Sequence, residues 1–149
     1  GKQMRIGIIS GYFNPLHTGH LDYIDSAHFR CHHLVVIVNS DEQVKLKGSI
    51  PFMNQDDRAR IVRALKGVNE VHISIDTDGS VVESIKSIYD SWNSRNFETT
   101  FSFMNGGDRL AGNTPEEQYC KQVGIETIYN VGGKKTQSSS ELINEATRT

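Results

Sequence analysis

Residues 11–20, GYFNPLHTGH, decide how the chain is interpreted. They follow an apolar run at residues 5–10 and precede an amphipathic segment. A loop that only reverses the chain needs glycine or proline, but it has no use for two histidines spaced three apart. Gly19 lets an anion approach the outward-pointing N–H groups of a helix start, and His17 and His20 lie on one face of that helix. The stretch therefore predicts a strand, a phosphate-binding loop and a helix, in that order.

Outward from this loop, short apolar runs alternate with amphipathic segments along the whole chain. The pattern predicts strands at residues 5–10, 33–39, 70–75, 100–105 and 125–131. It predicts helices at residues 20–30, 54–67, 80–92 and 114–124, with N-caps at Asn54, Ser80 and Thr114, stops at Gly67 and Gly124, and a further helix after residues 138–140. This alternation is typical of an α/β fold, a Rossmann-like, doubly wound, five-stranded parallel sheet with helices on both faces. Ligands are then expected beyond the carboxyl ends of the strands.

Length and charge narrow the class of protein further. The chain has 149 residues, and we expect residues 1–149 to form a single domain. Lys plus Arg number 16 and Asp plus Glu 18, so the net charge of -2 gives no general attraction to nucleic acid or to a membrane surface. No apolar run approaches the roughly 20 residues that span a bilayer, and a cytoplasmic location is expected. Cys31 and Cys120 are expected to be packing residues.

Three stretches together resemble one enzyme family. GYFNPLHTGH is similar to the HxGH signature of the nucleotidyltransferase superfamily that includes cytidylyltransferases, and TQSSSELI at residues 136–143 resembles its second signature. Residues 39–71 are similar to the corresponding part of glycerol-3-phosphate cytidylyltransferases and heptose-phosphate nucleotidyltransferases. NGGD at residues 105–108 also resembles the KGGD of the heptose-phosphate enzymes.

This resemblance implies a reaction and its partners. A nucleoside monophosphate would pass from CTP, or from ATP, to a sugar or alditol phosphate such as glycerol 3-phosphate, and pyrophosphate would leave with Mg²⁺. The magnesium would be bound with the triphosphate and not by a metal site of the protein. The small phosphorylated acceptor and the triphosphate would be the partners, and a homodimer is expected.

The resemblance also implies which residues act. His17, His20 and Lys47 would be catalytic, because they place positive charge where a phosphoryl transition state accumulates negative charge. Residues expected to bind the nucleotide are Gly11, Tyr12, Phe13, Asn14, Gly19, Arg58, Gly106, Gly107, Asp108, Gln137, Ser138, Ser139 and Ser140. The long segment 45–52 is expected to be mobile without ligand and to order over the triphosphate.

For several of these residues a second role is compatible with the sequence. Lys45 is a second candidate for the role of Lys47, and Arg58 could pair with Asp56 or Asp57 on a helix surface. The three serines could form a simple N-cap, and the histidines could merely decorate a helix start.

The sequence is also compatible with other functions. The F-N-P-x-H form is nearer to adenylyltransferases, and Lys134 and Lys135 stand where cytidylyltransferases commonly carry an arginine. An adenylyltransferase for a cofactor precursor such as phosphopantetheine, or a nucleotide-binding module without turnover, are the competing functions.

Overall fold

A computed structural model describes residues 3–107 and 112–133 of the chain. Its centre is a sheet of five strands in the order β3-β2-β1-β4-β5, and every neighbouring pair is parallel. The strands are β1 (Gln3–Gly11), β2 (His33–Val38), β3 (Glu70–Ile73), β4 (Glu98–Met104) and β5 (Glu126–Ile128). The predicted five-stranded parallel α/β fold is confirmed.

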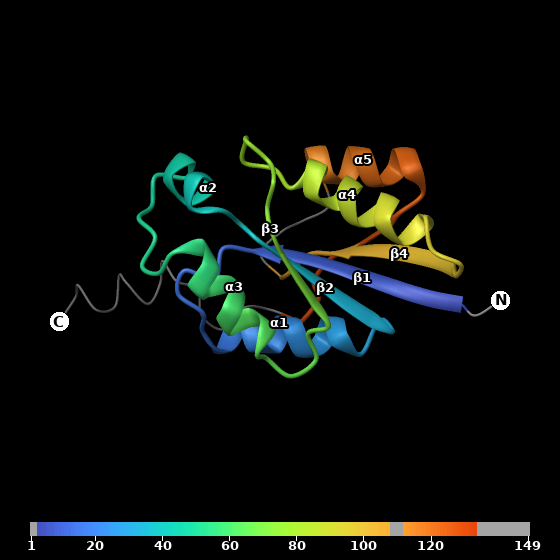
Figure 1. Cartoon of the computed structure of the whole chain (residues 1–149), viewed down its shortest axis with the longest axis horizontal. Helices are drawn as coiled ribbons and strands as arrows, with labels where there is room; N and C mark the ends of the chain where they lie inside the picture. The colour runs from blue at the N-terminus through green and yellow to red at the C-terminus, as the bar shows by residue number, and fades with distance from the viewer. Residues whose placement is uncertain (1–2, 108–111, 134–149) are drawn as a thin grey trace.

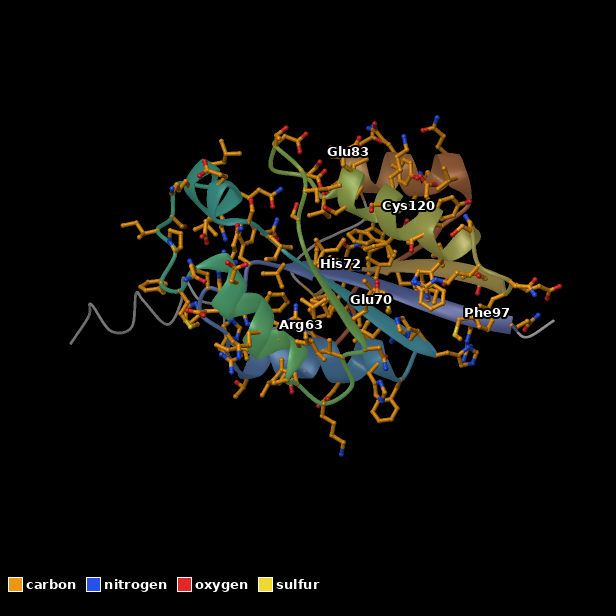
Figure 2. All side chains as sticks on the ribbon, in the orientation of Figure 1. Arg63, Glu70, His72, Glu83, Phe97 and Cys120 are labelled. Carbon is orange, nitrogen blue, oxygen red and sulfur yellow. The ribbon has the colours of Figure 1, made fainter. Side chains whose placement is uncertain are left out.

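Helices cover both faces of the sheet, as predicted (Figure 1). Helices α1 (Thr18–His28) and α3 (Gln55–Arg63) lie on one face, and α4 (Val82–Asn93) and α5 (Pro115–Val123) lie on the other. A short helix, α2 (Asp41–Leu46), lies beyond the carboxyl end of β2. Figure 2 shows Arg63 and Cys120 on opposite sides of the sheet, as expected from their helices.

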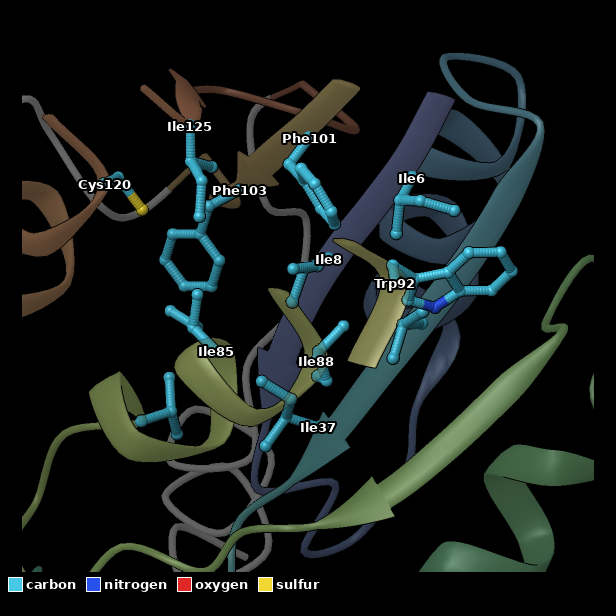
Figure 3. Packing of buried hydrophobic residues seen from close by; sticks show 12 residues of the cluster. Ile6, Ile8, Ile37, Ile85, Ile88, Trp92, Phe101, Phe103, Cys120 and Ile125 are labelled. Atoms are coloured by element: carbon cyan, nitrogen blue, oxygen red, sulfur yellow. The ribbon is translucent and has the colours of Figure 1, made fainter. Parts of the chain in front are cut away.

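The two faces of the sheet build two hydrophobic clusters because neighbouring strand residues point to opposite sides. In β1, Ile6 and Ile8 pack under α4 and α5, whereas Ile9 packs under α1 and α3. Figure 3 shows the first cluster, where Ile85 and Trp92 of α4 lie over the strands. Trp92 is only 4% exposed and packs its helix.

Both cysteines are packing residues, as predicted. Cys120 is fully buried in the first cluster, and burial raises the pKa of its thiol to about 11. Cys31 packs against the second cluster, and burial also raises the pKa of its thiol. Neither thiol is therefore activated as a nucleophile at neutral pH.

Three local expectations were wrong. Helix α2 was missed, so residues 41–46 are helical and not part of a loop. Ser80 does not cap α4; the carboxylate of Asp76 accepts hydrogen bonds from the backbone N–H groups of Glu83 and Ser84, at 2.7 and 3.0 Å. Helix α3 ends at Arg63, four residues before the expected stop at Gly67. The helix expected after residues 138–140 lies outside the described residues.

Candidate active site at the carboxyl ends of the strands

The first loop begins where β1 ends, at Gly11. A side chain at Gly11 would meet the ring of Phe13 at 2.8 Å, and that ring is buried with 1% of its surface exposed. Gly11 therefore makes room for Phe13, which adopts a positive φ of 51° as the chain turns. Phe13 itself packs in the cluster under α1 and α3 and fixes the base of the loop. The structure shows a packing role for Gly11 and Phe13, and their expected contact with a nucleotide stays a prediction.

His17 and His20 form the N-terminal cap of α1. His17 is the N-cap residue, and its Nδ1 accepts a hydrogen bond from the backbone N–H of Gly19 at 3.1 Å. The Nδ1 of His20 accepts in turn from the backbone N–H of His17, also at 3.1 Å. The two rings are stacked with centroids 3.9 Å apart, and the ring of Phe13 lies 4.9 Å from that of His20.

This cap fixes the tautomer of both histidines. A neutral imidazole that accepts at Nδ1 carries its hydrogen on Nε2, so each ring then has an Nε2–H donor group. Both side chains take part in the cap, so neither histidine is incidental to the helix start, and their catalytic role stays a prediction. The N-terminus of α1 adds the positive end of its helix dipole.

Helix α2 brings the two candidate lysines to different surroundings. The ammonium of Lys47 lies 4.2 Å from the centre of the Tyr12 ring, a cation–π contact with the first loop. Lys45 instead points at Glu42 on its own helix, with 3.5 Å between Nζ and the carboxylate oxygen. Of the two lysines, Lys47 is the one that the structure places against the histidine loop.

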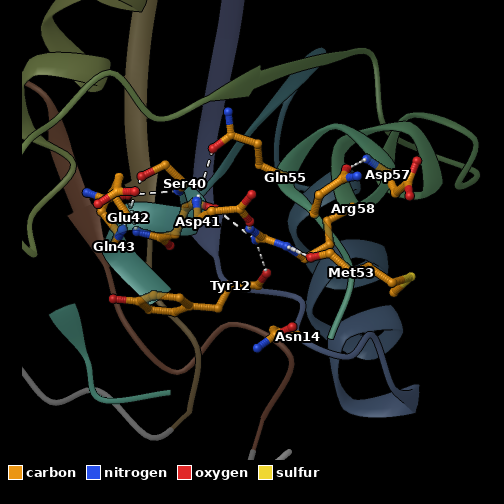
Figure 4. Close-up of polar contacts among 12 residues, drawn as sticks. Tyr12, Asn14, Ser40, Asp41, Glu42, Gln43, Met53, Gln55, Asp57 and Arg58 are labelled. Atoms are coloured by element: carbon orange, nitrogen blue, oxygen red, sulfur yellow. Dashed lines mark hydrogen bonds and ion pairs between the residues drawn. The ribbon is translucent and has the colours of Figure 1, made fainter. Parts of the chain in front are cut away.

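Arg58 is buried beneath this loop and not exposed to a ligand. Its side chain is fully buried and donates to the carbonyls of Tyr12 and Asn39, to that of Met53, and to the carboxylate of Asp41 at 2.7 Å (Figure 4). The expected pairing with Asp56 or Asp57 is wrong, since Asp41 is the ion-pair partner. These four acceptors engage the guanidinium within the protein, and the expected phosphate contact stays a prediction.

Asn14 has a similar structural task. Its side-chain amide donates to the carbonyl of Ile50 at 2.9 Å, and its side-chain oxygen accepts from the backbone N–H of Phe52 at 2.7 Å. Asn14 thus joins the first loop to the segment that follows Lys47, and its expected contact with a nucleotide stays a prediction. Residues 45 and 46 of the segment expected to be mobile belong to α2, and Asn14 holds two of its remaining residues.

The glycines after β4 lie at the same edge of the sheet. A side chain at Gly107 would come within 2.1 Å of the carbonyl oxygen of Gly133, so these two loops touch through their backbones. Gly107 is required by this approach, and Gly106 precedes it at the end of the strand. The remaining site candidates, Asp108, Gln137, Ser138, Ser139 and Ser140, lie outside the described residues.

Some residues of this region were not found from the sequence. Gln43 is buried, and its side chain donates to the carbonyls of Asp78 and Ser80, which ties α2 to the loop after β3. Asp41 holds Arg58, as described above. The signal was present, because Ser40 and Gln43 form a capping box, and a serine followed three residues later by a glutamine marks a helix start.

Two kinds of feature are absent from residues 3–107 and 112–133. No group of three His, Cys, Asp or Glu side chains there is arranged to hold a metal ion. No helix within these ranges has the length and apolar character needed to cross a membrane.

Parallel α/β sheets bind their ligands beyond the carboxyl ends of the strands, where this sheet carries the stacked histidines, Lys47 and the glycine loops. Residues 8–143 match the Cytidylyltransferase-like family, and the chain belongs to that family.

Similar proteins agree with this assignment. The bifunctional protein HldE of Hyphomonas neptunium is 44% identical over 77 residues, which cover 50% of this chain and 16% of that protein. The FAD synthase of Thermococcus kodakarensis is 37% identical over 89 residues, 58% of each chain. Both matches thus cover less than two thirds of the relative.

A solved structure shares the fold. The lipopolysaccharide core biosynthesis protein of Thermoplasma volcanium has a TM-score of 0.63 at 20% identity, over 91% of this chain and 99% of that one. Family and relatives together support nucleotidyltransferase activity.

Proposed function

We propose that the protein transfers a nucleoside monophosphate from a nucleoside triphosphate to the phosphate of a small acceptor. The single observation that carries this proposal is the cap of α1, in which Nδ1 of His17 and of His20 each accepts a backbone N–H. Two Nε2–H donors beside a helix N-terminus are suited to an anionic phosphate, and they are fixed before a ligand binds.

The reaction needs no nucleophile from the protein. An oxygen of the acceptor phosphate forms a bond to the α-phosphorus, and the bond from that phosphorus to the bridging oxygen breaks with its electron pair leaving on pyrophosphate. Magnesium would arrive bound to the triphosphate, as part of the substrate, and would leave with pyrophosphate. The histidines would donate to the phosphate oxygens as charge develops, and Lys47 would add a point charge.

The donor nucleotide is ATP or CTP. The whole-chain resemblance to cytidylyltransferases favours CTP slightly. Two observations now favour ATP: the F-N-P-x-H form of the first loop, and the similarity to an FAD synthase, whose product contains an adenylyl group. We therefore propose ATP as the better donor, with CTP as the competitor to be tested.

The acceptor is a sugar or alditol phosphate, or a phosphorylated cofactor precursor. Residues 39–71 favour the first class, and the similarity to an FAD synthase favours the second. The expected homodimer stays a prediction, which sedimentation velocity would test.

A pyrophosphate-release assay tests the function. ATP, CTP, GTP and UTP are each offered with Mg²⁺ and a panel that includes glycerol 3-phosphate, heptose phosphates, FMN and phosphopantetheine. We expect release that requires both a triphosphate and one acceptor class and that is lost in the His17→Asn variant. Nucleotide binding without release for any pair would instead indicate a binding module and refute the proposal.

A further inference from the structure

The segment that carries Lys47 is fixed to the rest of the site by two side chains. Asn14, in the first loop, forms hydrogen bonds with the carbonyl of Ile50 and the N–H of Phe52. Arg58, buried beneath the segment, donates to the carbonyl of Met53 at 3.0 Å. Between these contacts and α2 lies Gly48, whose φ of 87° allows the chain to turn directly after Lys47.

The same two side chains also hold the histidine loop. Asn14 belongs to that loop, and Arg58 donates to the carbonyl of Tyr12 at 2.8 Å (Figure 4). Each therefore joins the loop that carries Tyr12 to the segment that follows Lys47. The Lys47 ammonium in turn lies over the Tyr12 ring.

We propose that Asn14 and Arg58 are positioning residues that act through Lys47. They set the Lys47 ammonium against the first loop and so place its charge beside the histidine donors. Lys47 is an exposed side chain on a long flexible stem, and a misplacement of about 1 Å at a reacting centre lowers a rate about a hundredfold. This inference rests on the proposed function only for its kinetic consequence, because the hydrogen bonds of Asn14 and Arg58 are a feature of the fold.

The kinetic test is a double-mutant cycle with Asn14→Ala and Lys47→Ala. If Asn14 acts through Lys47, Asn14→Ala lowers kcat at least tenfold and changes the dissociation constant of the triphosphate by less than about threefold. In the Lys47→Ala background, adding Asn14→Ala should then lower kcat by less than about threefold. Equal losses of kcat in both backgrounds, or a dissociation constant raised tenfold, would overturn the proposal, because Asn14 would then act directly on the nucleotide.

Two further variants separate positioning from general loss of structure. Asn69→Ala is the matched control, because Asn69 also accepts a backbone N–H, that of Leu34 at 2.9 Å, at the opposite end of the sheet. It is expected to keep kcat within about twofold, whereas a loss equal to that of Asn14→Ala would refute the specific role of Asn14. Arg58→Lys retains the charge without the fork of donors and should lower kcat through Lys47 in the same way.

A spectroscopic measurement is independent of turnover. The ring of Tyr12 should shift the NMR signals of the Lys47 ε-methylene upfield, and Tyr12→Leu supplies the unshifted reference. We expect Asn14→Ala and Arg58→Lys to reduce this shift and Asn69→Ala to keep it. A shift unchanged in all three variants would refute the proposal that Asn14 and Arg58 position Lys47. A shift that depends on Asn14 in a protein without transfer activity would refute only the proposed function.

Discussion

His17 combines two tasks that a substitution can separate. Its Nδ1 caps α1 by accepting the N–H of Gly19, and its Nε2–H is the proposed donor to phosphate. Asparagine is among the best N-cap residues, so His17→Asn keeps an acceptor for the helix but removes the second ring nitrogen. His17→Ala removes both groups.

The magnitudes follow from these two tasks. Loss of one fixed donor to a developing charge costs about 2.7 to 4 kcal/mol of transition-state stabilisation, a factor of about 10² to 10³ in kcat. Loss of the cap costs about 1 kcal/mol of folding stability. We therefore expect both variants to lose kcat by at least about a hundredfold, and only His17→Ala to unfold at lower denaturant concentration.

The assay is pyrophosphate release under saturating triphosphate and magnesium, with urea unfolding in parallel. Turnover of His17→Asn within a few-fold of the wild type would refute the donor role and leave His17 as a cap alone. Equal stability of the two variants would refute the reasoning about the cap.

Three other outcomes are expected. Lys47→Ala should lower kcat at least tenfold, and Lys45→Ala should not, since Lys45 pairs with Glu42; equal small effects on pyrophosphate release would exclude the lysine from the mechanism. Hydrogen bonds from His72 and His33 lower the pKa of the Glu70 carboxyl from its ordinary value of 4.5 to about 2 (Figure 2). The carboxylate therefore stabilises the fold fully above pH 4.5, and this contribution is lost as the pH falls toward 2. Glu70→Gln should thus be less stable by roughly 1 kcal/mol near pH 5 and equal to the wild type at the lower limit, as measured by urea unfolding. Asp76→Ala should destabilise α4 by about 1 kcal/mol or more and leave kcat unchanged, and an unchanged unfolding midpoint would contradict its capping role.

The sheet could be predicted from the sequence because its central strands β1 and β2 carry runs of buried apolar residues. In β2, for example, residues 34–38 are all buried, and such an apolar run has few alternatives to a central parallel strand. The ends of elements were less predictable. Ser80 has the right chemistry for a cap, but Asp76, in the loop after β3, accepts from the N–H groups of Glu83 and Ser84, which no local pattern reveals.

The candidate residues that the structure describes lie near the carboxyl ends of the strands, as the sequence indicates, and their roles toward a ligand stay predictions. His17 and His20 are candidates because their chemistry and their spacing in the chain point to the same task. The hydrogen-bond partners of Arg58 and Asn14 could not be predicted, because they lie 46 and 36 residues away in sequence, at Tyr12 and Ile50. A polar residue near a motif suggests a ligand, and only the fold shows that its hydrogen bonds are made within the protein.

The position of the site, in loops beyond the strand ends, explains why residue 58 is an arginine. The backbones of loops beyond the strand ends have no neighbouring strand to pair with. The proposed transfer would nevertheless need three of these loops held in fixed positions relative to one another. A guanidinium offers five donors in a rigid plane and can therefore hold carbonyls from the first loop, from the end of β2 and from the segment after Lys47 at once. A lysine would place its donors on a single nitrogen and could not span these acceptors. The pairing with Asp41 at 2.7 Å offsets the cost of burying the charge and joins α2 to the same centre.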